Sequence, residues 1–267
     1  DPAENLFKLS SQKHNIICDY LNRDSISKFN TKFDVITAQN VLAHNDHPKD
    51  FLLICKEHLN DDGYIFIQTS QALMVERNEF DTIYHEHISF FSMKSMEALA
   101  KSVGLNLVDI RLTSIHGTSF VFVLSKDMTK PSYEIEHELT QKDIEKYSKA
   151  CYKVSYDLYE KIIALGDKGY ILVGYGAAAK GNTLLNFSKF KLDFIIDDNP
   201  LKHNLFTPGS RIPIVGIDKL QEISEDQKIA FVPLAWNFFD EIKYRVKQAR
   251  RNDNDIFIKY FPEVTTI

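Results

Sequence analysis

The sequence has 267 residues, of which 44% are hydrophobic and 26% are charged, a balance that excludes a disordered or fibrous chain. The formal net charge of −5 argues against a nucleic-acid partner, because such binding needs clustered basic side chains. The only dense basic run, 243–251, is interpreted as a solvated helix face. Single cores rarely grow beyond roughly 250 to 300 residues, so we expect two domains.

The three cysteines, Cys18, Cys55 and Cys151, are far apart and show no C-x-x-C spacing. They predict neither a disulfide framework nor a zinc site, and they fit a reducing compartment. No apolar run approaches the ~18 residues of a membrane helix, and no signal peptide is recognisable. We therefore expect a cytoplasmic protein without a membrane partner, present as a monomer or weak homodimer. Because the chain begins with Asp1-Pro2 and not methionine, we also expect a preceding segment.

Short apolar runs alternate with amphipathic ones in the first half of the chain, as in a βαβ series. The predicted strands are 16–18, 33–38, 64–67, 105–112 and 119–124, and the predicted helices are 51–59 and 92–103. Turns are expected at Asp61-Asp62-Gly63 and at His116-Gly117. The polar stretch 126–132 is interpreted as the boundary between two domains, 1–128 and 129–267.

A long helix is expected over 133–165, where apolar residues recur at helical spacing without glycine or proline. A second βαβ series follows this helix. Its predicted strands are 170–173, 192–196, 212–215, 229–233 and 256–260, and its predicted helices are 179–187 and 238–250. The pattern predicts an α/β protein of two Rossmann-like three-layer domains joined by a long helical segment.

A glycine-rich run, Gly174-Tyr175-Gly176-Ala177-Ala178-Ala179, follows a predicted strand and opens the next helix. Such a G-x-G-x-x-A loop brings the backbone close to a pyrophosphate at the helix amino terminus, and an acid after the next strand, here Asp197, can bind a ribose hydroxyl. Lys180 adds a positive charge to the loop. The loop alone would indicate NAD, but residues 181–186 do not match a hydride-transfer enzyme. The alternative is a tight βα turn that binds nothing.

Titratable side chains gather in a second segment, 78–87, which contains Tyr84-His85-Glu86-His87. The two histidines lack the i, i+4 spacing of a zincin, so a metal site is disfavoured. An imidazole titrates near ~6.5 and suits acid–base catalysis at neutral pH. The alternative is a polar loop that caps the next helix. A third segment places Gln39, Asn40 and His44 after the strand 33–38, where ligands of open α/β sheets bind.

Together these segments resemble the sugar C-methyltransferase family over nearly the whole chain. The family's acidic-Pro pair, Asn-Val-Leu-Ala-His segment, Glu-Phe-Asp-Thr-Ile-Tyr-His-Glu-His segment and His-Gly-x-Ser turn are similar to 1–2, 40–44, 79–87 and 116–119. Further similarities lie in 174–186, 197–202, 208–214 and Trp236-Asn237. Two features depart from the family: its cysteine zinc module and first glycine loop are not in this sequence, and 68–71 replace a frequent Pro-Tyr, which leaves the sugar open.

The resemblance implies an incomplete class I methyltransferase domain over 1–128 and a Rossmann-like nucleotide-sugar-binding domain over 129–267. It implies methyl transfer from S-adenosylmethionine, through an enolate, to a carbon of a nucleoside-diphosphate keto-deoxysugar, without a metal. His87 would be the catalytic base, supported by Tyr84 and Glu86. The expected cofactor-binding residues are Asp1, Asp19, Gln39, Asn40 and His44. The expected substrate-binding residues are His116, Gly174, Gly176, Ala178, Lys180, Gly181, Asn182, Thr183, Asp197 and Asn237.

Three alternatives stay open at the level of sequence. The glycine loop with Asp197 also suits an NAD-dependent nucleotide-sugar oxidoreductase or dehydratase, although we expect neither NAD nor NADP to bind usefully. A non-catalytic nucleotide-sugar binding module is the second alternative. In the third, an O-methyltransferase, His87 would remove a proton from a hydroxyl group.

Overall fold

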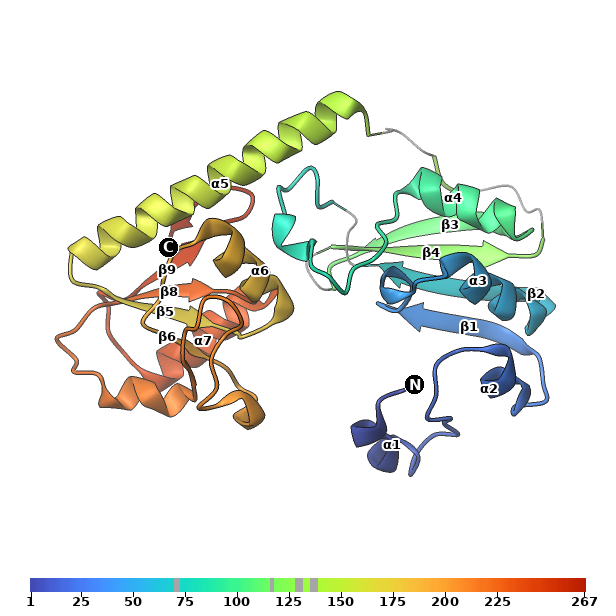
Figure 1. The fold of residues 1–267 in the computed structure, drawn as a ribbon, viewed down its shortest axis with the longest axis horizontal. Helices are drawn as coiled ribbons and strands as arrows, with labels where there is room; N and C mark the ends of the chain where they lie inside the picture. Colours follow the sequence, from blue (N-terminus) through green and yellow to red (C-terminus); the bar gives the residue numbers. More distant parts are fainter. Residues whose placement is uncertain (70–72, 116–117, 128–131, 135–138) are drawn as a thin grey trace. The chain divides into compact units, whose positions relative to one another are not determined.

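The chain forms two compact units in a computed structural model that describes residues 1–69, 73–115, 118–127, 132–134 and 139–267. Unit 1 comprises Asp1–Ala72 and Glu86–Glu138, and unit 2 comprises Leu73–His85 and Leu139–Ile267. Residues 73–85, called the strap below, therefore belong to unit 2 although parts of unit 1 flank them in sequence. Figure 1 shows the helices and strands of both units.

Unit 1 is built around a four-stranded mixed sheet with the order β1-β2-β4-β3. Its helices and strands are α1 (Glu4–Ser10), α2 (Arg23–Ser27), β1 (Phe33–Gln39), η1 (Leu42–His44), α3 (Pro48–Glu57), β2 (Leu59–Thr69), α4 (Met93–Ser102), β3 (Asn106–Thr113) and β4 (Ser119–Ser125). β1 and β2 are parallel and joined through α3, while β4 is antiparallel to both of its neighbours. The apolar faces of α3 and α4 pack on one face of this sheet (Figure 1).

Two local predictions for unit 1 are wrong. Residues 16–18 are only partly buried and form no strand. Three consecutive apolar residues were therefore not enough to predict a strand. The turn expected at Asp61-Asp62-Gly63 lies inside β2, which is longer than predicted. A Cβ atom on Gly63 would lie 2.9 Å from the carbonyl oxygen of Asp34 on β1, so this glycine permits close strand approach and not a turn.

Unit 2 has a six-stranded sheet with the order β10-β9-β8-β5-β6-β7, parallel except for β10. Its main elements are η2 (Phe80–Thr82), α5 (Gln141–Asp167), β5 (Ile171–Tyr175), α6 (Ala179–Ser188), β6 (Phe194–Ile196), η3 (Pro200–Lys202), β7 (Ile214–Val215), η4 (Ile217–Glu222), β8 (Ile229–Pro233), η5 (Trp236–Phe238), α7 (Phe239–Ala249), β9 (Ile256–Lys259) and β10 (Thr265–Thr266). Alternate residues of β8 enter two separate cores, one under α5 and α6 and the other under η4 and α7. Unit 2 is therefore a three-layer Rossmann-like fold, which confirms the α/β prediction.

The long helix exists, but its predicted start is wrong. α5 begins after Thr140, whose hydroxyl accepts a hydrogen bond from the Asp143 amide in a capping box. Tyr133 lies outside the helix and donates a hydrogen bond to Glu97 of unit 1 at 3.1 Å. The helix ends at Asp167, and Gly169 then takes a φ of +77° as a terminating glycine.

Within the described part of the chain, no helix is both long and apolar enough to cross a membrane. The same residues contain no group of three or more His, Cys, Asp and Glu side chains arranged to hold a metal ion.

Candidate functional site

Unit 1 contains a pocket of about 710 Å³ at the carboxyl end and free edge of β1. This volume lies within the roughly 300 to 1,000 Å³ range of ligand pockets in proteins. The structure brings all five residues expected to bind the cofactor into its lining: Asp1, Asp19, Gln39, Asn40 and His44. The position agrees with the rule that ligands of open α/β sheets bind beyond the carboxyl ends of the strands.

Asn40 shows that this pocket suits a polar ligand. It has a φ of +52°, which turns the chain sharply after β1, and its backbone amide donates to the Gln68 carbonyl at 3.1 Å. The side-chain oxygen Oδ1 is buried and has no hydrogen-bond partner among the described residues. An unpaired buried acceptor costs free energy until a donor satisfies it. An amino or hydroxyl group of a bound cofactor would supply that donor.

The expected base, His87, lies beside this pocket within unit 1. Its side chain is only 7% exposed, and its ring centroid lies 4.7 Å from that of His44, which lines the pocket. The carbonyl oxygen of Ala43 accepts hydrogen bonds from the amides of Ile88 and Ser89, at 2.9 and 3.1 Å. These two bonds tie the backbone after His87 to η1, which keeps the backbone that carries the imidazole next to the pocket.

The other two expected catalytic residues are placed differently. Glu86 is exposed and belongs to unit 1, whereas Tyr84 is half-buried and belongs to the strap of unit 2. The boundary between the units therefore runs through the Tyr84-His85-Glu86-His87 sequence. Within unit 1, the structure places His87 beside the pocket, against His44, and leaves Glu86 exposed.

The glycines of the loop in unit 2 are required by the packing of the chain itself. A Cβ atom on Gly174 would lie 2.9 Å from Ile195, and one on Gly181 would lie 2.7 Å from the Leu234 side chain. Gly176 has a φ of +94°, and a Cβ there would lie 2.8 Å from that of Ala235. These glycines let β5, the loop and α6 pack closely, as in dinucleotide-binding folds, whether or not a ligand binds.

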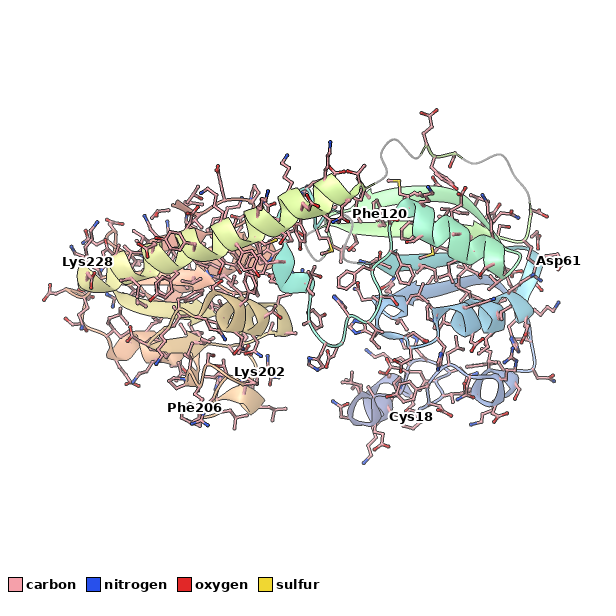
Figure 2. The ribbon with its side chains drawn as sticks, turned by 45° about the horizontal axis from the view of Figure 1, so that its top comes forward. Cys18, Asp61, Phe120, Lys202, Phe206 and Lys228 are labelled. Carbon is pink, nitrogen blue, oxygen red and sulfur yellow. The ribbon has the colours of Figure 1, made fainter. Side chains whose placement is uncertain are left out.

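Asp197 supports the loop from inside the protein. Its Oδ2 accepts from the Ala177 amide at 2.7 Å and from the Lys202 ammonium at 3.1 Å, and its Oδ1 accepts from the Asn199 amide at 2.9 Å. The side chain of Lys202, labelled in Figure 2, also donates to the Ala177 carbonyl at 2.9 Å. Because both oxygens of Asp197 are engaged and the residue is 7% exposed, this geometry argues against the ribose contact expected from the sequence.

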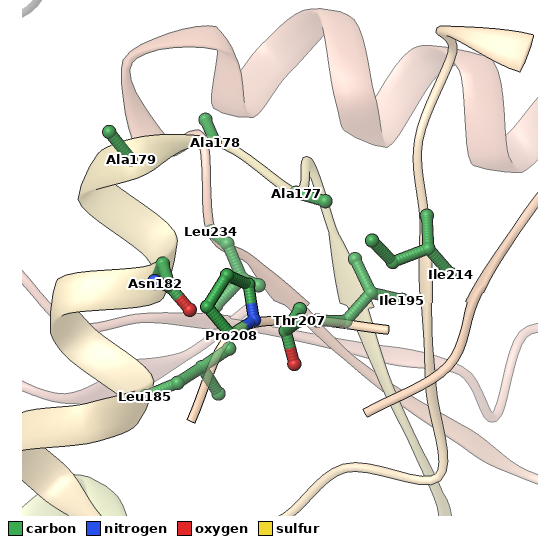
Figure 3. Close-up of a pocket in the computed structure, with 10 residues that line it drawn as sticks. All are labelled: Ala177, Ala178, Ala179, Asn182, Leu185, Ile195, Thr207, Pro208, Ile214 and Leu234. Atoms are coloured by element: carbon green, nitrogen blue, oxygen red, sulfur yellow. The ribbon is translucent and has the colours of Figure 1, made fainter. Parts of the chain in front are cut away.

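The amino-terminal turn of α6 remains as the candidate anion site. No side chain among the described residues caps this turn, and both Ala178 and Ala179 are exposed. The first amides of a helix lack partners within the helix and favour negative charge. Next to the turn lies a pocket of about 180 Å³, shown in Figure 3, which the side chain of Asn182 enters from α6 opposite Pro208. Its volume suits a phosphate group better than a whole nucleotide sugar.

The remaining expected substrate residues have varied places. Thr183 donates its hydroxyl to the Ala179 carbonyl within α6, at 3.2 Å. Asn237 is half-buried in η5, and Lys180 is half-buried in the first turn of α6. His116 lies outside the described residues. The sequence interpretation did not assign Lys202 a role, although its position after Asn199-Pro200 was part of the family pattern.

Two carboxyl groups of the strap are buried in unit 2 without having been predicted as site residues. Burial raises the pKa of Glu79 to about 7 and that of Asp81 to about 6, and the nearby Lys180 charge opposes both shifts. Glu79 is 3% exposed and Asp81 is fully buried. Their position in the Glu-Phe-Asp sequence of the family pattern was the only signal that could have singled them out.

Comparison with known proteins agrees with this geometry. Residues 3–110 match the family model described as a methyltransferase domain, and the fold and the pocket of unit 1 fit such a domain. Residues 114–262, more than half of the chain, match the model described as a C-methyltransferase C-terminal domain. The chain therefore belongs to the C-methyltransferase family, which confirms the resemblance seen in its sequence. S-adenosylmethionine is the methyl donor implied by this membership.

One similar protein is the C-methyltransferase NovU of Streptomyces niveus. The two are 30% identical over 231 residues, which is 78% of this chain and 52% of NovU. The chain thus spans about half the length of this relative.

Proposed function

We propose that the chain binds S-adenosylmethionine in unit 1 and a nucleoside-diphosphate keto-deoxysugar in unit 2, and methylates a carbon of the sugar. The observation that carries the proposal is the convergence of Asp1, Asp19, Gln39, Asn40 and His44 on one pocket that adjoins His87 through His44. Bound S-adenosylmethionine supplies a methyl group made electrophilic by its positively charged sulfur. Family membership and the name of NovU support carbon as the acceptor.

His87 acts as the base in this proposal. A ketone acidifies the hydrogen on the neighbouring carbon, and the imidazole of His87 takes that proton as the carbon–hydrogen bond breaks. The electron pair moves onto the ketone oxygen as an enolate. The nucleophilic carbon would then take the methyl group that S-adenosylmethionine, held by Asp1, Asp19, Gln39, Asn40 and His44, would supply, with uncharged S-adenosylhomocysteine as the leaving group. Tyr84 would donate a hydrogen bond to the enolate oxygen, and Glu86 would stabilise the imidazolium or bind a sugar hydroxyl.

Unit 2 would hold the diphosphate at the amino terminus of α6. The amides of Ala178 and Ala179, the charge of Lys180 and the amide side chain of Asn182 supply this end with donors. In this revised proposal Gly174, Gly176, Gly181 and Asp197 shape the loop instead of touching the ligand. Thr183, Asn237 and His116 remain predicted contacts for the rest of the nucleotide sugar.

The test of the base separates proton removal from methyl transfer. His87→Asn keeps a polar side chain but cannot accept a proton at neutral pH, so solvent deuterium exchange beside the ketone and methylation should both fall by ~100-fold or more. His85→Asn is the matched control, because His85 is an exposed imidazole two residues away. It should leave both rates near those of the wild type. Near-normal exchange in His87→Asn, with loss of exchange in Tyr84→Phe, would assign the proton to the phenol.

The same assay addresses the alternatives. Methylation of a hydroxyl without carbon exchange would indicate an O-methyltransferase, and binding without either reaction would indicate a binding module. The NAD-dependent alternative depended on Asp197, whose carboxylate is engaged within the protein. Calorimetric titration with NAD and NADP should therefore show no useful affinity.

A further inference from the structure

A chain of three side chains joins the strap to the first turn of α6. Trp236 donates its indole N–H to Oδ2 of Asp81 at 2.7 Å, and Nζ of Lys180 lies 5.0 Å from the centroid of the Trp236 rings. The indole thus uses its edge for the carboxylate and its face for the ammonium. The first contact is a hydrogen bond to a charged acceptor and the second is a cation–π contact, and both favour one relative orientation of the side chains they join.

Asp81, the residue of this network that lies in the strap, is firmly anchored in unit 2. Asp81 is fully buried, and the preceding Phe80 packs its ring against those of Phe187 and Phe261, with centroids 4.8 and 5.4 Å apart. Phe261 also packs edge-on against Trp236 at 5.6 Å. Asp81 therefore cannot shift without disturbing the core under α5 and α6.

We propose that Asp81 and Trp236 are positioning residues that hold the Lys180 ammonium at the amino-terminal turn of α6 for the substrate diphosphate. The ligand in this inference rests on the proposed function. A lysine side chain has many rotamers, and holding it in place before binding reduces the entropy that an anion must overcome. Recognition of the diphosphate in unit 2 thereby depends on a segment that continues directly into Tyr84 and His87.

Trp236 is the only tryptophan of the chain, so the tryptophan emission of the folded protein comes from this residue alone. Lys180→Met should change the emission of Trp236 in the absence of any ligand, because the ammonium no longer lies over the ring. The matched control is Lys191→Met, which alters an exposed lysine of the same unit. It should leave the emission unchanged. Unchanged emission in Lys180→Met would overturn the inference regardless of any ligand.

The second measurement is a double-mutant cycle on the binding of uridine diphosphate and thymidine diphosphate, followed by calorimetry with the whole chain. Lys180→Met should raise Kd by ~10-fold, and Asp81→Asn by ~3-fold, because an amide accepts the indole N–H less strongly than a carboxylate. The double variant should bind like Lys180→Met, since Asp81 acts only through Lys180. Multiplied losses, ~30-fold in the double variant, would show independent structural effects and overturn the positioning role.

Two further outcomes are separable. If the wild type binds neither diphosphate, the proposed nucleotide-sugar site fails, and the role of the network in recognition fails with it. If Asp81→Asn does not fold, Trp236→Phe takes its place in the cycle, because it removes the indole N–H and keeps an aromatic face. The same comparison then applies: a double variant that binds like Lys180→Met supports the inference, and multiplied losses overturn it.

Discussion

Replacing Glu79 with glutamine should make unit 2 more stable at neutral and alkaline pH. The carboxyl group is 3% exposed, and its burial raises its pKa from 4.5 to about 7 despite the opposing charge of Lys180. Between pH 4.5 and about 7, the folded state therefore keeps a proton on Glu79 that the unfolded chain has released. The contribution of Glu79 to stability is full below about pH 4.5 and is lost as the pH rises through about 7.

The size of the effect follows from the two pKa values. At 1.36 kcal/mol per pKa unit, a rise from 4.5 to about 7 corresponds to about 3 kcal/mol of unfolding free energy lost from acid to alkaline pH. Glu79→Gln carries no charge at either pH and should lack this loss. Asp81 contributes in the same direction in both proteins, since burial raises its pKa to about 6, so the difference between them isolates Glu79.

Urea unfolding followed by the fluorescence of Trp236 measures this effect in the whole chain, because the single tryptophan lies in unit 2. The control is Glu225→Gln, an exposed carboxyl elsewhere in unit 2, which should reproduce the pH dependence of the wild type. Identical slopes between pH 5 and 8 for Glu79→Gln and the wild type would refute the reasoning. They would mean that water reaches this carboxylate in the folded protein.

Three further changes test the loop and the core. Asp197→Asn should lower the free energy of unfolding, measured with urea, by about 2 kcal/mol, because it disturbs a buried set of three hydrogen bonds. Asp198→Asn, at a half-exposed ion pair, should lower it by less than about 1 kcal/mol. Equal losses in the two variants would contradict this prediction. Gly176→Ala should destabilise the protein by roughly 1 to 3 kcal/mol, because the backbone at this position has a positive φ. Gly166→Ala, inside α5, should leave the stability unchanged or raise it. Destabilisation by both substitutions would contradict this prediction. Burial raises the pKa of Cys55 to about 12, so iodoacetamide at pH 8 should modify it only after unfolding, and rapid reaction of the native protein would contradict its burial.

Much of the fold was predictable because local pattern and packing agree in the elements concerned. β1, α4, β5 and α6 lie within one or two residues of the predicted ranges, since each combines clear periodicity with a cap or a following turn. The failures occurred where distant residues decide. Residues 16–18 lack a strand to pair with among the described residues, and Gly63 serves the approach of β1 instead of a turn.

The candidate site shows the same division. Gln39, Asn40 and His44 could be placed from sequence because they directly follow a strand, and ligands bind at such ends in open sheets. The role of Asp197 could not, because only the folded loop shows both carboxylate oxygens bonded to Ala177, Asn199 and Lys202. A carboxylate that holds the protein and one that awaits a ribose look identical in a sequence.

The sequence by itself determined the two Rossmann-like halves, the glycine loop and the family, because these are carried by periodicity and by contiguous motifs. Only the tertiary structure decided that residues 73–85 belong to unit 2 and that Asp81, Trp236 and Lys180 form one network. These residues are 56 to 155 positions apart along the chain, and nothing local in the sequence encodes their contact. Their association follows from the packing of Phe80 into the core under α5 and α6. This packing is stabilised by burial of apolar surface between residues distant in sequence, and not by local backbone conformation.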